Sequence, residues 1–583
     1  MSNLDETRRR FVAHFASIGL GSTLLPGVLW AEMQQTGAKT INADMLKTAL
    51  SMSGLEFSET DRASMLENAN QTLTRWEAQR KLKIPNDVSP PFHFSPIVPG
   101  IEVSRTKVPF RISDAPALKR PANLEDVAFW PVRHLAELIK TRQVTSVELT
   151  QMYLARLHKH DPKLHCVVTF LDELGMAQAK KADTEIAVGK YKGPLHGIPW
   201  GAKDIIAVKG YKTTWGSAVY TEQVIDQEAS VVEMLREAGA VLIAKLTTGE
   251  FAHGDTWFGG QTRNPWNPAE GSGGSSAGPA SATAAGLVGF AIGTETGGSI
   301  LGPSRRCGVT GLRPTFGRIS RYGVMALSWT HDRLGPMCRY AEDCALVMNV
   351  IAKPDGRDMS VFDVPFNWNA QLDIKKLRVG YIKDGFDNEP DPAAKQNGQK
   401  VLEQLQTMGV KLIPLTIPEF DVNVSMYDVE SAAFFDELTR SGRDKQMTQQ
   451  NTANTFRSVR LWPAVEYIQG QRARMVMMMK LAEATAGLDV YVALQNPNVG
   501  GGGARGAAPN QPQQPQNPTQ RHSNMAVSAG YPGLAVPSGF FASGNPTSIT
   551  FFGRPFKETE VIALGKAYQD ASGHHLKHPN LQA

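Results

Sequence analysis

The chain has 583 residues, of which 20% are charged and 42% are hydrophobic, and its formal net charge at pH 7 is +5. These values are ordinary for a soluble globular protein, and the length allows a large core and more than one compact unit. The charge is spread along the chain without a sustained basic run after the first dozen residues. Nucleic-acid binding therefore has no support from the composition. The four cysteines imply no disulfide framework.

Residues 1–31 have the pattern of an export signal. Arg8, Arg9 and Arg10 precede a moderately apolar stretch, Val12–Ala31. This arrangement is typical of a twin-arginine signal peptide. Glycine and proline interrupt the stretch, so no stable membrane-spanning helix is predicted. We expect an exported protein, periplasmic or extracellular; if the segment is instead an amphipathic helix, the protein is cytoplasmic.

Residues 32–125 are predicted to be a helical extension followed by a proline-rich connector. Helical patterns occur in Ala43–Met52 and in Glu59–Lys83. Five prolines follow between residues 85 and 99. We expect this segment to pack as an arm on the rest of the chain rather than to fold independently.

Residues 126–583 are predicted to form one α/β domain. A capping box at Thr145 and Glu148 begins a helix that we expect to end near His158. Apolar runs typical of strands are Cys166–Phe170, Val241–Ala244, Val288–Ile292, Val379–Tyr381 and Leu534–Val536. Helical patterns between these runs favour a layered α/β domain. Residues 497–520 are of low complexity and are expected to form a mobile surface loop.

Two glycine-framed serines and one lysine carry the chemistry that the sequence predicts. Ser275 lies in the tract Gly271–Gly278, Ser299 follows two glycines, and Lys203 has apolar neighbours on both sides. A glycine–serine tract by itself is typical of a flexible linker. A serine hydroxyl becomes a nucleophile only when a base takes its proton, and an uncharged lysine can be that base. The three residues together therefore favour a catalytic site.

The motifs around these residues resemble those of the amidase signature enzymes. In chain order they are Gly193–Pro199, Lys203–Asp204, Gly274–Ser276, Gly293–Ile300, Cys307–Thr315, Gly530–Phe540 and Gly553–Phe556. The resemblance covers roughly residues 125 to 580. It implies an α/β amidase signature fold, in which helices sandwich a mixed central β-sheet, here preceded by the N-terminal helical extension.

The resemblance also implies a role for each site residue. Ser299 would be the nucleophile that forms the acyl-enzyme, Ser275 the bridging serine on a cis peptide bond, and Lys203 the terminal base. Lys203 must then be uncharged, which burial among apolar groups favours by lowering its pKa. The backbone N–H groups expected to form the oxyanion hole are those of Thr296, Gly297 and Gly298.

Three positions depart from the family pattern. Leu301 stands where family members commonly have an arginine, Glu295 replaces the usual aspartate, and Ala277 stands where glycine is common. Substrate recognition that depends on the missing arginine, such as recognition of an acidic or amino-acid-like group, cannot be carried over. The residues of the predicted triad are unaffected.

We expect an amidase that hydrolyses C–N bonds of small-molecule carboxylic amides, with esters or carbamates as further substrates. No cofactor and no metal is predicted. Two alternatives are the amidase-type subunit of a tRNA-dependent amidotransferase and a catalytically silent binding scaffold. The oligomeric state is open, and a homo-oligomer is compatible with the sequence. Pocket size is expected to depend on residues 325–335, 425–475 and 497–520.

Overall fold

The structure is a computed structural model that describes residues 40–581 except 53–54, 81–93, 115, 421, 423, 425 and 495–517. The predicted export signal, residues 1–31, lies outside the described residues. So does most of the predicted loop 497–520, of which residues 518–520 begin helix α18 (Pro518–Ser528). Among the described residues, no helix combines the length and the apolar character that crossing a membrane requires.

The chain divides into two compact units. The first combines residues 1–92 with 421–476, and the second combines residues 93–420 with 477–583. The predicted boundary between residues 125 and 126 stays a prediction.

The larger unit is built on an eleven-stranded mixed sheet. Its strand order is β1-β3-β2-β8-β10-β9-β14-β15-β13-β11-β12. The strands are β1 (Val167–Phe170), β2 (Pro199–Lys203), β3 (Val241–Leu246), β8 (Phe290–Glu295), β9 (Thr310–Arg313), β10 (Arg333–Cys338), β11 (Val379–Ile382), β12 (Leu412–Leu415), β13 (Val490–Leu494), β14 (Gly533–Phe540) and β15 (Pro546–Gly553). The apolar runs predicted as strands overlap β1, β3, β8, β11 and β14, although Cys166, Val288 and Gly289 come before the observed strands. Parallel pairs join β2 to β3 and β8, and β11 to β12 and β13.

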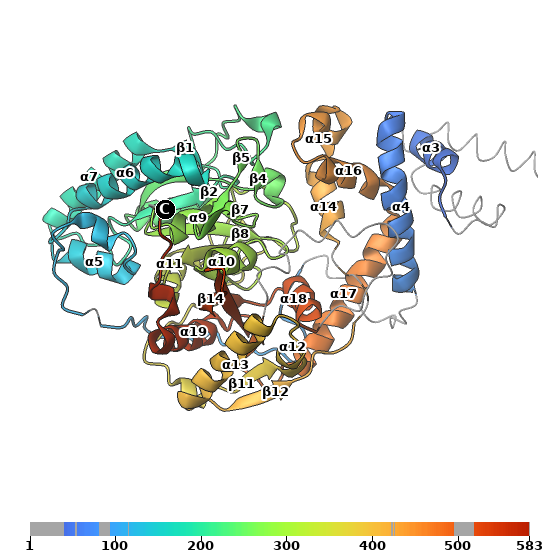
Figure 1. Ribbon diagram of the computed structural model, residues 1–583. Coiled ribbons are helices and arrows are strands. Elements are labelled where there is room, and N and C mark those ends of the chain that lie inside the picture. The colour runs from blue at the N-terminus through green and yellow to red at the C-terminus, as the bar shows by residue number, and fades with distance from the viewer. Residues whose placement is uncertain are drawn as a thin grey trace, which may run out of the picture. The chain divides into compact units, whose positions relative to one another are not determined.

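Helices flank this sheet, so the predicted fold class is confirmed. They are α5 (Val132–Lys140), α6 (Ser146–Leu164), α7 (Asp172–Ala187), α8 (Ser230–Glu237), α9 (Ala277–Ala284), α10 (Leu301–Cys307), α11 (Ala341–Ile351), α12 (Lys383–Asp387), α13 (Pro392–Thr407), α18 and α19 (Glu558–Ser572). Helices α6 and α7 pack at the β2–β3 end, and α12 and α13 at the β11–β15 end (Figure 1). Among the described residues, this unit's other strands form two short hairpins, β4 (Thr256–Trp257) with β5 (Gly260–Gln261) and β6 (Arg263–Asn264) with β7 (Asn267–Gly271).

Helix α6 has the predicted start but a later end. The Thr145 side chain accepts a hydrogen bond from the N–H of Glu148, and the Glu148 carboxylate accepts one from the N–H of Thr145. The helix continues past His158 to Leu164 and includes Pro162 in its last turn. The next residue, His165, caps this end of the helix with a left-handed backbone conformation, a common way for a helix to close.

The smaller unit joins the N-terminal extension to a segment from much later in the chain. The predicted helices appear as α3 (Ala43–Met52) and α4 (Glu59–Arg80), beside α14 (Tyr427–Phe434), α15 (Asp436–Arg440), α16 (Gln450–Ser458) and the first turns of α17 (Ala464–Ala484). Arg457 forms ion pairs with both Asp61 (2.8 Å) and Asp444 (2.7 Å), and Trp76 packs edge-on against Trp462. The extension thus packs directly on residues 421–476.

Candidate active site

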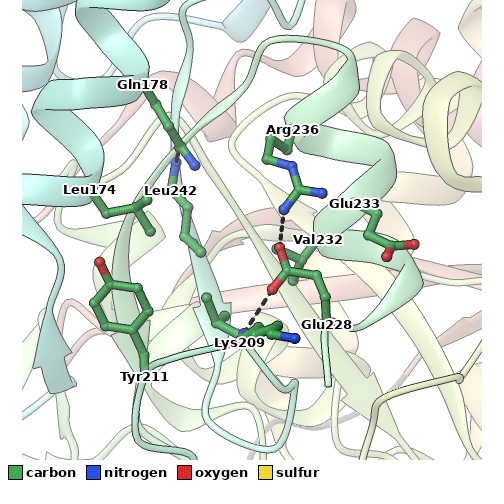
Figure 2. Close-up of a pocket in the computed structure, with 10 residues that line it drawn as sticks. Leu174, Gln178, Lys209, Tyr211, Glu228, Val232, Glu233, Arg236 and Leu242 are labelled. Carbon is green, nitrogen blue, oxygen red and sulfur yellow. Dashed lines mark hydrogen bonds and ion pairs between the residues drawn. The ribbon is translucent and has the colours of Figure 1, made fainter. Parts of the chain in front are cut away.

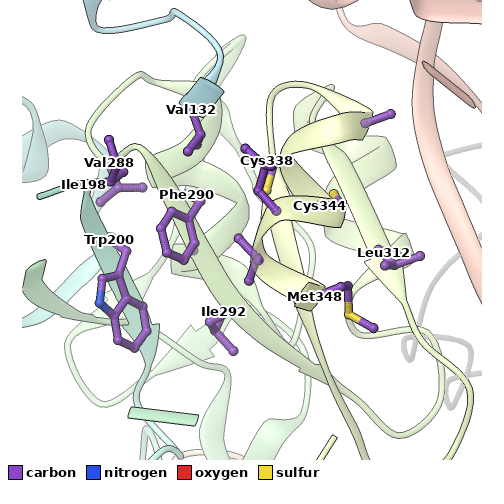
Figure 3. Packing of buried hydrophobic residues seen from close by; sticks show 14 of the residues in the cluster. Val132, Ile198, Trp200, Val288, Phe290, Ile292, Leu312, Cys338, Cys344 and Met348 are labelled. Atoms are coloured by element: carbon purple, nitrogen blue, oxygen red, sulfur yellow. The ribbon is translucent and has the colours of Figure 1, made fainter. Parts of the chain in front are cut away.

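Strand β2 carries Lys203 into the interior of the sheet. The strand is paired on both sides, and Trp200 stacks on Phe290 of β8 with ring centroids 5.9 Å apart (Figure 3). Every residue of β2 is buried, and the Lys203 side chain has no exposed area. The Lys203 amine therefore loses its hydration, and none of its hydrogen-bond partners among the described residues is a carboxylate.

The Lys203 amine lies among hydroxyl groups. Its Nζ is 2.8 Å from Ser275 Oγ, 2.8 Å from Thr294 Oγ1 and 3.2 Å from Ser276 Oγ. The structure therefore brings together two of the three predicted triad residues. Thr294 and Ser276 were not predicted as contacts; their positions inside the two serine motifs were the only sequence indication.

Burial lowers the pKa of Lys203 to about 7, against the opposing attraction of Asp332 and Glu295. Loss of solvent disfavours the ammonium form more strongly than these two carboxylates favour it. Near neutral pH a substantial fraction of Lys203 is therefore the free amine, as a proton acceptor must be.

The loop that carries Ser275 is held close to another backbone segment. The Gly274–Ser275 peptide bond is cis. The N–H of Gly273 donates to Asp255 Oδ2 at 2.9 Å. A Cβ atom added at Gly274 would lie 1.8 Å from the carbonyl oxygen of Gly254, so only glycine fits there.

Gly274→Ala should therefore displace Ser275. Backbone atoms cannot rotate away from the new methyl group, and a misplacement of about 1 Å in a reacting group can cost on the order of 100-fold in rate. We expect kcat/KM on any amide substrate to fall by at least about that factor. Gly487→Ala is the control, because nothing lies within 4 Å of a Cβ atom at that exposed glycine. Equal activities of the two variants would contradict this interpretation.

Ser299 lies in the turn between β8 and α10. Residues 297–299 are half-buried, and Gly298 has a φ of +115°, which favours glycine. The Ser299 carbonyl accepts a hydrogen bond from the N–H of Ser276 at 3.1 Å. This bond joins the backbone of the two serine motifs.

Two carboxylates hold this turn. Glu295 Oε2 accepts hydrogen bonds from the N–H groups of Ile300 (2.8 Å) and Leu301 (2.9 Å), while its Oε1 pairs with buried Arg313 at 2.8 Å. Burial opposes ionisation of Glu295, but the arginines nearby bring its pKa below the usual value. Asp332 accepts a hydrogen bond from Thr296 Oγ1 at 2.5 Å.

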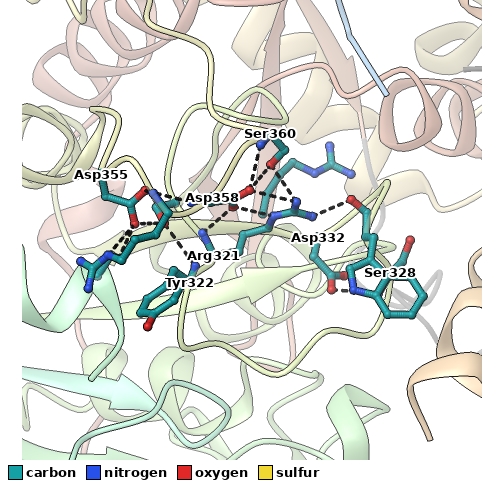
Figure 4. Close-up of polar contacts among 12 residues, drawn as sticks. Arg321, Tyr322, Ser328, Asp332, Asp355, Asp358 and Ser360 are labelled. Atoms are coloured by element: carbon teal, nitrogen blue, oxygen red, sulfur yellow. Dashed lines mark hydrogen bonds and ion pairs between the residues drawn. The ribbon is translucent and has the colours of Figure 1, made fainter. Parts of the chain in front are cut away.

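The second carboxylate also fixes its own loop. Asp332 Oδ2 accepts hydrogen bonds from the N–H groups of Leu327 (2.7 Å) and Ser328 (2.8 Å) (Figure 4). In the same view Arg321 pairs with Asp358, which anchors the start of this loop. Asp332 thus ties part of the variable segment 325–335 to the turn that contains Thr296.

Gly298→Val should lower turnover while the protein stays folded. The branched side chain is strained at this φ and would tilt the N–H groups of the turn, and one oxyanion donor is worth about 10²- to 10³-fold in kcat. We expect a decrease of that size. Gly544→Val is the matched control, because Gly544 also has a positive φ (+84°) but lies exposed at the β14–β15 turn. Comparable losses in both variants would refute a special role for the 296–298 turn.

A separate pocket of about 310 Å³ lies between α7, α8 and β3 (Figure 2). Its lining residues are Leu174, Gln178, Val208, Lys209, Tyr211, Glu228, Val232, Glu233, Arg236 and Leu242. Glu228 pairs with Arg236 and accepts a hydrogen bond from the Lys209 N–H, so positive and negative groups offset each other at this rim. None of the predicted site residues lines it.

Comparison with known proteins identifies the family. The family model Amidase matches residues 148–562, which is more than half of the chain. The chain belongs to the amidase family. It is therefore an enzyme that acts on amide C–N bonds, as the sequence motifs predicted.

Individual relatives divide into two groups. In sequence the chain is 34% identical to a glutamyl-tRNA(Gln) amidotransferase subunit from Methylococcus capsulatus, over 76% of this chain and 98% of the relative. The protein of the same name from Roseiflexus sp. is also 34% identical, over 76% and 97%. Among solved structures, the native peptide amidase of Stenotrophomonas maltophilia is similar with a TM-score of 0.67 and 28% identity, over 78% of this chain and 99% of that chain. The sequence relatives named here are thus amidotransferase subunits, whereas the structural relative is a peptide amidase.

Proposed function

We propose that the protein cleaves the C–N bond of small-molecule carboxylic amides through an acyl-enzyme on Ser299. The observation that carries this proposal is the 2.8 Å contact between Lys203 Nζ and Ser275 Oγ in a fully buried setting. Burial there brings the pKa of Lys203 to about 7, which makes the amine available as a base.

In the proposed reaction, neutral Lys203 takes the proton of Ser275 as Ser275 takes the proton of Ser299. The freed Ser299 oxygen attacks the amide carbonyl carbon. The N–H groups of Thr296, Gly297 and Gly298 donate hydrogen bonds to the carbonyl oxygen and stabilise the negative charge that develops on it. The relay then runs in reverse and protonates the leaving nitrogen as the C–N bond breaks. Water, activated by the same relay, hydrolyses the ester on Ser299 and restores the enzyme.

A second candidate is an amidase-type subunit that works with a partner and tRNA. The named sequence relatives support it, because they match over almost their whole length. Leu301 in place of the family arginine counts against it, as does the export pattern of residues 1–31. The two candidates share the chemistry at Ser299 and differ in partner and location; for the first candidate we propose an exported enzyme.

The test is a hydrolysis screen of the full chain on aliphatic, aryl and amino-acid amides and on the matching esters. Ser299→Ala gives the background. Turnover by the isolated wild-type chain above the Ser299→Ala background supports the stand-alone enzyme. Turnover that appears only when a copurified partner protein and tRNA are added supports the amidotransferase candidate. No Ser299-dependent turnover under either condition would support the silent scaffold and overturn the proposal.

A further inference from the structure

A second lysine is buried one strand away from Lys203. Lys245 belongs to β3, which pairs with β2, and its side chain has no exposed area. Its Nζ lies 2.7 Å from Asp204 Oδ1 and also donates to Thr213 Oγ1 at 2.9 Å. Buried lysines are rare because the ammonium loses its hydration, and this one is compensated by a carboxylate.

That carboxylate belongs to the residue directly after Lys203. The N–H of Asp204 continues the pairing of the strand by donating to the carbonyl of Leu246 at 2.8 Å. Its Oδ2 accepts hydrogen bonds from the N–H (2.9 Å) and the hydroxyl (2.5 Å) of Thr214. Neighbouring side chains of an extended strand point to opposite faces. Lys203 accordingly contacts the serine motifs, while Asp204 contacts Lys245 and Thr214.

An unpaired carboxylate at this position would oppose the chemistry proposed for Lys203. Two opposite charges roughly 10 Å apart in a medium of effective dielectric about 20 shift each other's titration by about one pH unit. Asp204 is fully buried, so solvent would screen it little. A cation paired with Asp204 cancels most of the electrostatic effect of this carboxylate on Lys203.

We propose that Lys245 is a positioning residue that neutralises Asp204 and so allows Lys203 to act as an uncharged base. This inference rests on the proposed function. Within the part of the chain that the structure describes, the other charged groups that act on the pKa of Lys203 are Asp332, from the loop before β10, and Glu295, at the end of β8. Arg313 of β9 is paired with Glu295, which limits the pull of that carboxylate. Because Asp204 is paired with Lys245, its carboxylate does not add to the attraction of Asp332 and Glu295 for the protonated form of Lys203.

The experiment measures the rate of Ser299 labelling by a serine-reactive phosphonate, and kcat/KM where a substrate is known, from pH 5 to 9.5. In Lys245→Gln the glutamine keeps a hydrogen-bonding group near Thr213 but removes the cation. Asp204 then favours protonated Lys203, and the midpoint of the acidic limb should rise by about one pH unit. In the double variant Asp204→Asn/Lys245→Gln both charges are gone, and the midpoint should return to that of the wild type.

A merely structural role would lower the plateau or the Tm of both variants without moving the midpoint, and that result would overturn the proposal. If Lys245→Gln does not fold, Lys245→Met removes the same cation with a side chain of similar volume. The midpoint should again rise by about one pH unit, and an unmoved midpoint contradicts the inference. A wild-type chain without any pH-dependent reaction at Ser299 would instead refute the proposed function, so the two failures are distinguishable.

Discussion

Replacing Ser299 by alanine should abolish both turnover and labelling by a serine-reactive phosphonate. The proposed reaction passes through an ester on the Ser299 oxygen, and alanine has no atom that can form it. Loss of the nucleophile in a serine hydrolase typically costs on the order of 10⁶-fold in kcat. We therefore expect activity to fall to the level of the buffer or of a trace contaminant.

The matched control for Ser299→Ala is Ser543→Ala, an exposed serine at the β14–β15 turn. It should label and turn over substrate like the wild type. Thermal unfolding of both variants checks that the fold is intact. Phosphonate labelling that persists in Ser299→Ala would place the nucleophile elsewhere, and the roles of Ser275 and Lys203 would then have to be reassigned.

Activity should also depend strongly on pH, because only unprotonated Lys203 can act as the proposed base. Burial lowers the pKa of this lysine to about 7, so the neutral, reactive form dominates above that pH and declines about tenfold per unit below it. We expect kcat/KM to rise with pH through about 7 and to level off by about pH 8.5. A pH–rate profile between 5 and 9.5 measures this directly.

Lys203→Met is the companion variant. Methionine fills a similar volume but cannot accept a proton, and general-base catalysis contributes about 10²- to 10⁴-fold. The kcat/KM of the variant should fall by at least about 10²-fold, and the rise of its pH–rate profile near pH 7 should disappear. A wild-type profile that is flat from pH 5.5 to 8.5, or a limb that survives in Lys203→Met, would exclude Lys203 as the base.

Features that depend on neighbours in sequence could be predicted from the sequence. The capping box at Thr145 is a contact between residues three positions apart, and the start of α6 follows from it. The helical pattern of residues 43–52 predicted both ends of α3, because helical periodicity is local. The glycines around Ser275 and Ser299 pointed to a site because such motifs occur as short runs of adjacent residues.

Strand β2 was harder to predict. Its residues, Pro199–Lys203, include proline and glycine, which disfavour strands. It is extended because β3 and β8 pair with it on both sides. The same pairing buries Lys203, so the lowered pKa on which its proposed role as a base depends is a result of tertiary structure.

The ordered local motifs were enough to indicate the family and the class of chemistry and to predict a triad. The groups that surround Lys203, Ser275 and Ser299 could be identified only from the fold. Ion pairs join Lys245 to Asp204 and Arg457 to Asp61, and a hydrogen bond joins Thr296 to Asp332. In each case the two residues are far apart in the sequence. Such contacts follow from strand order and helix packing, where sequence separation does not set the distance between two side chains.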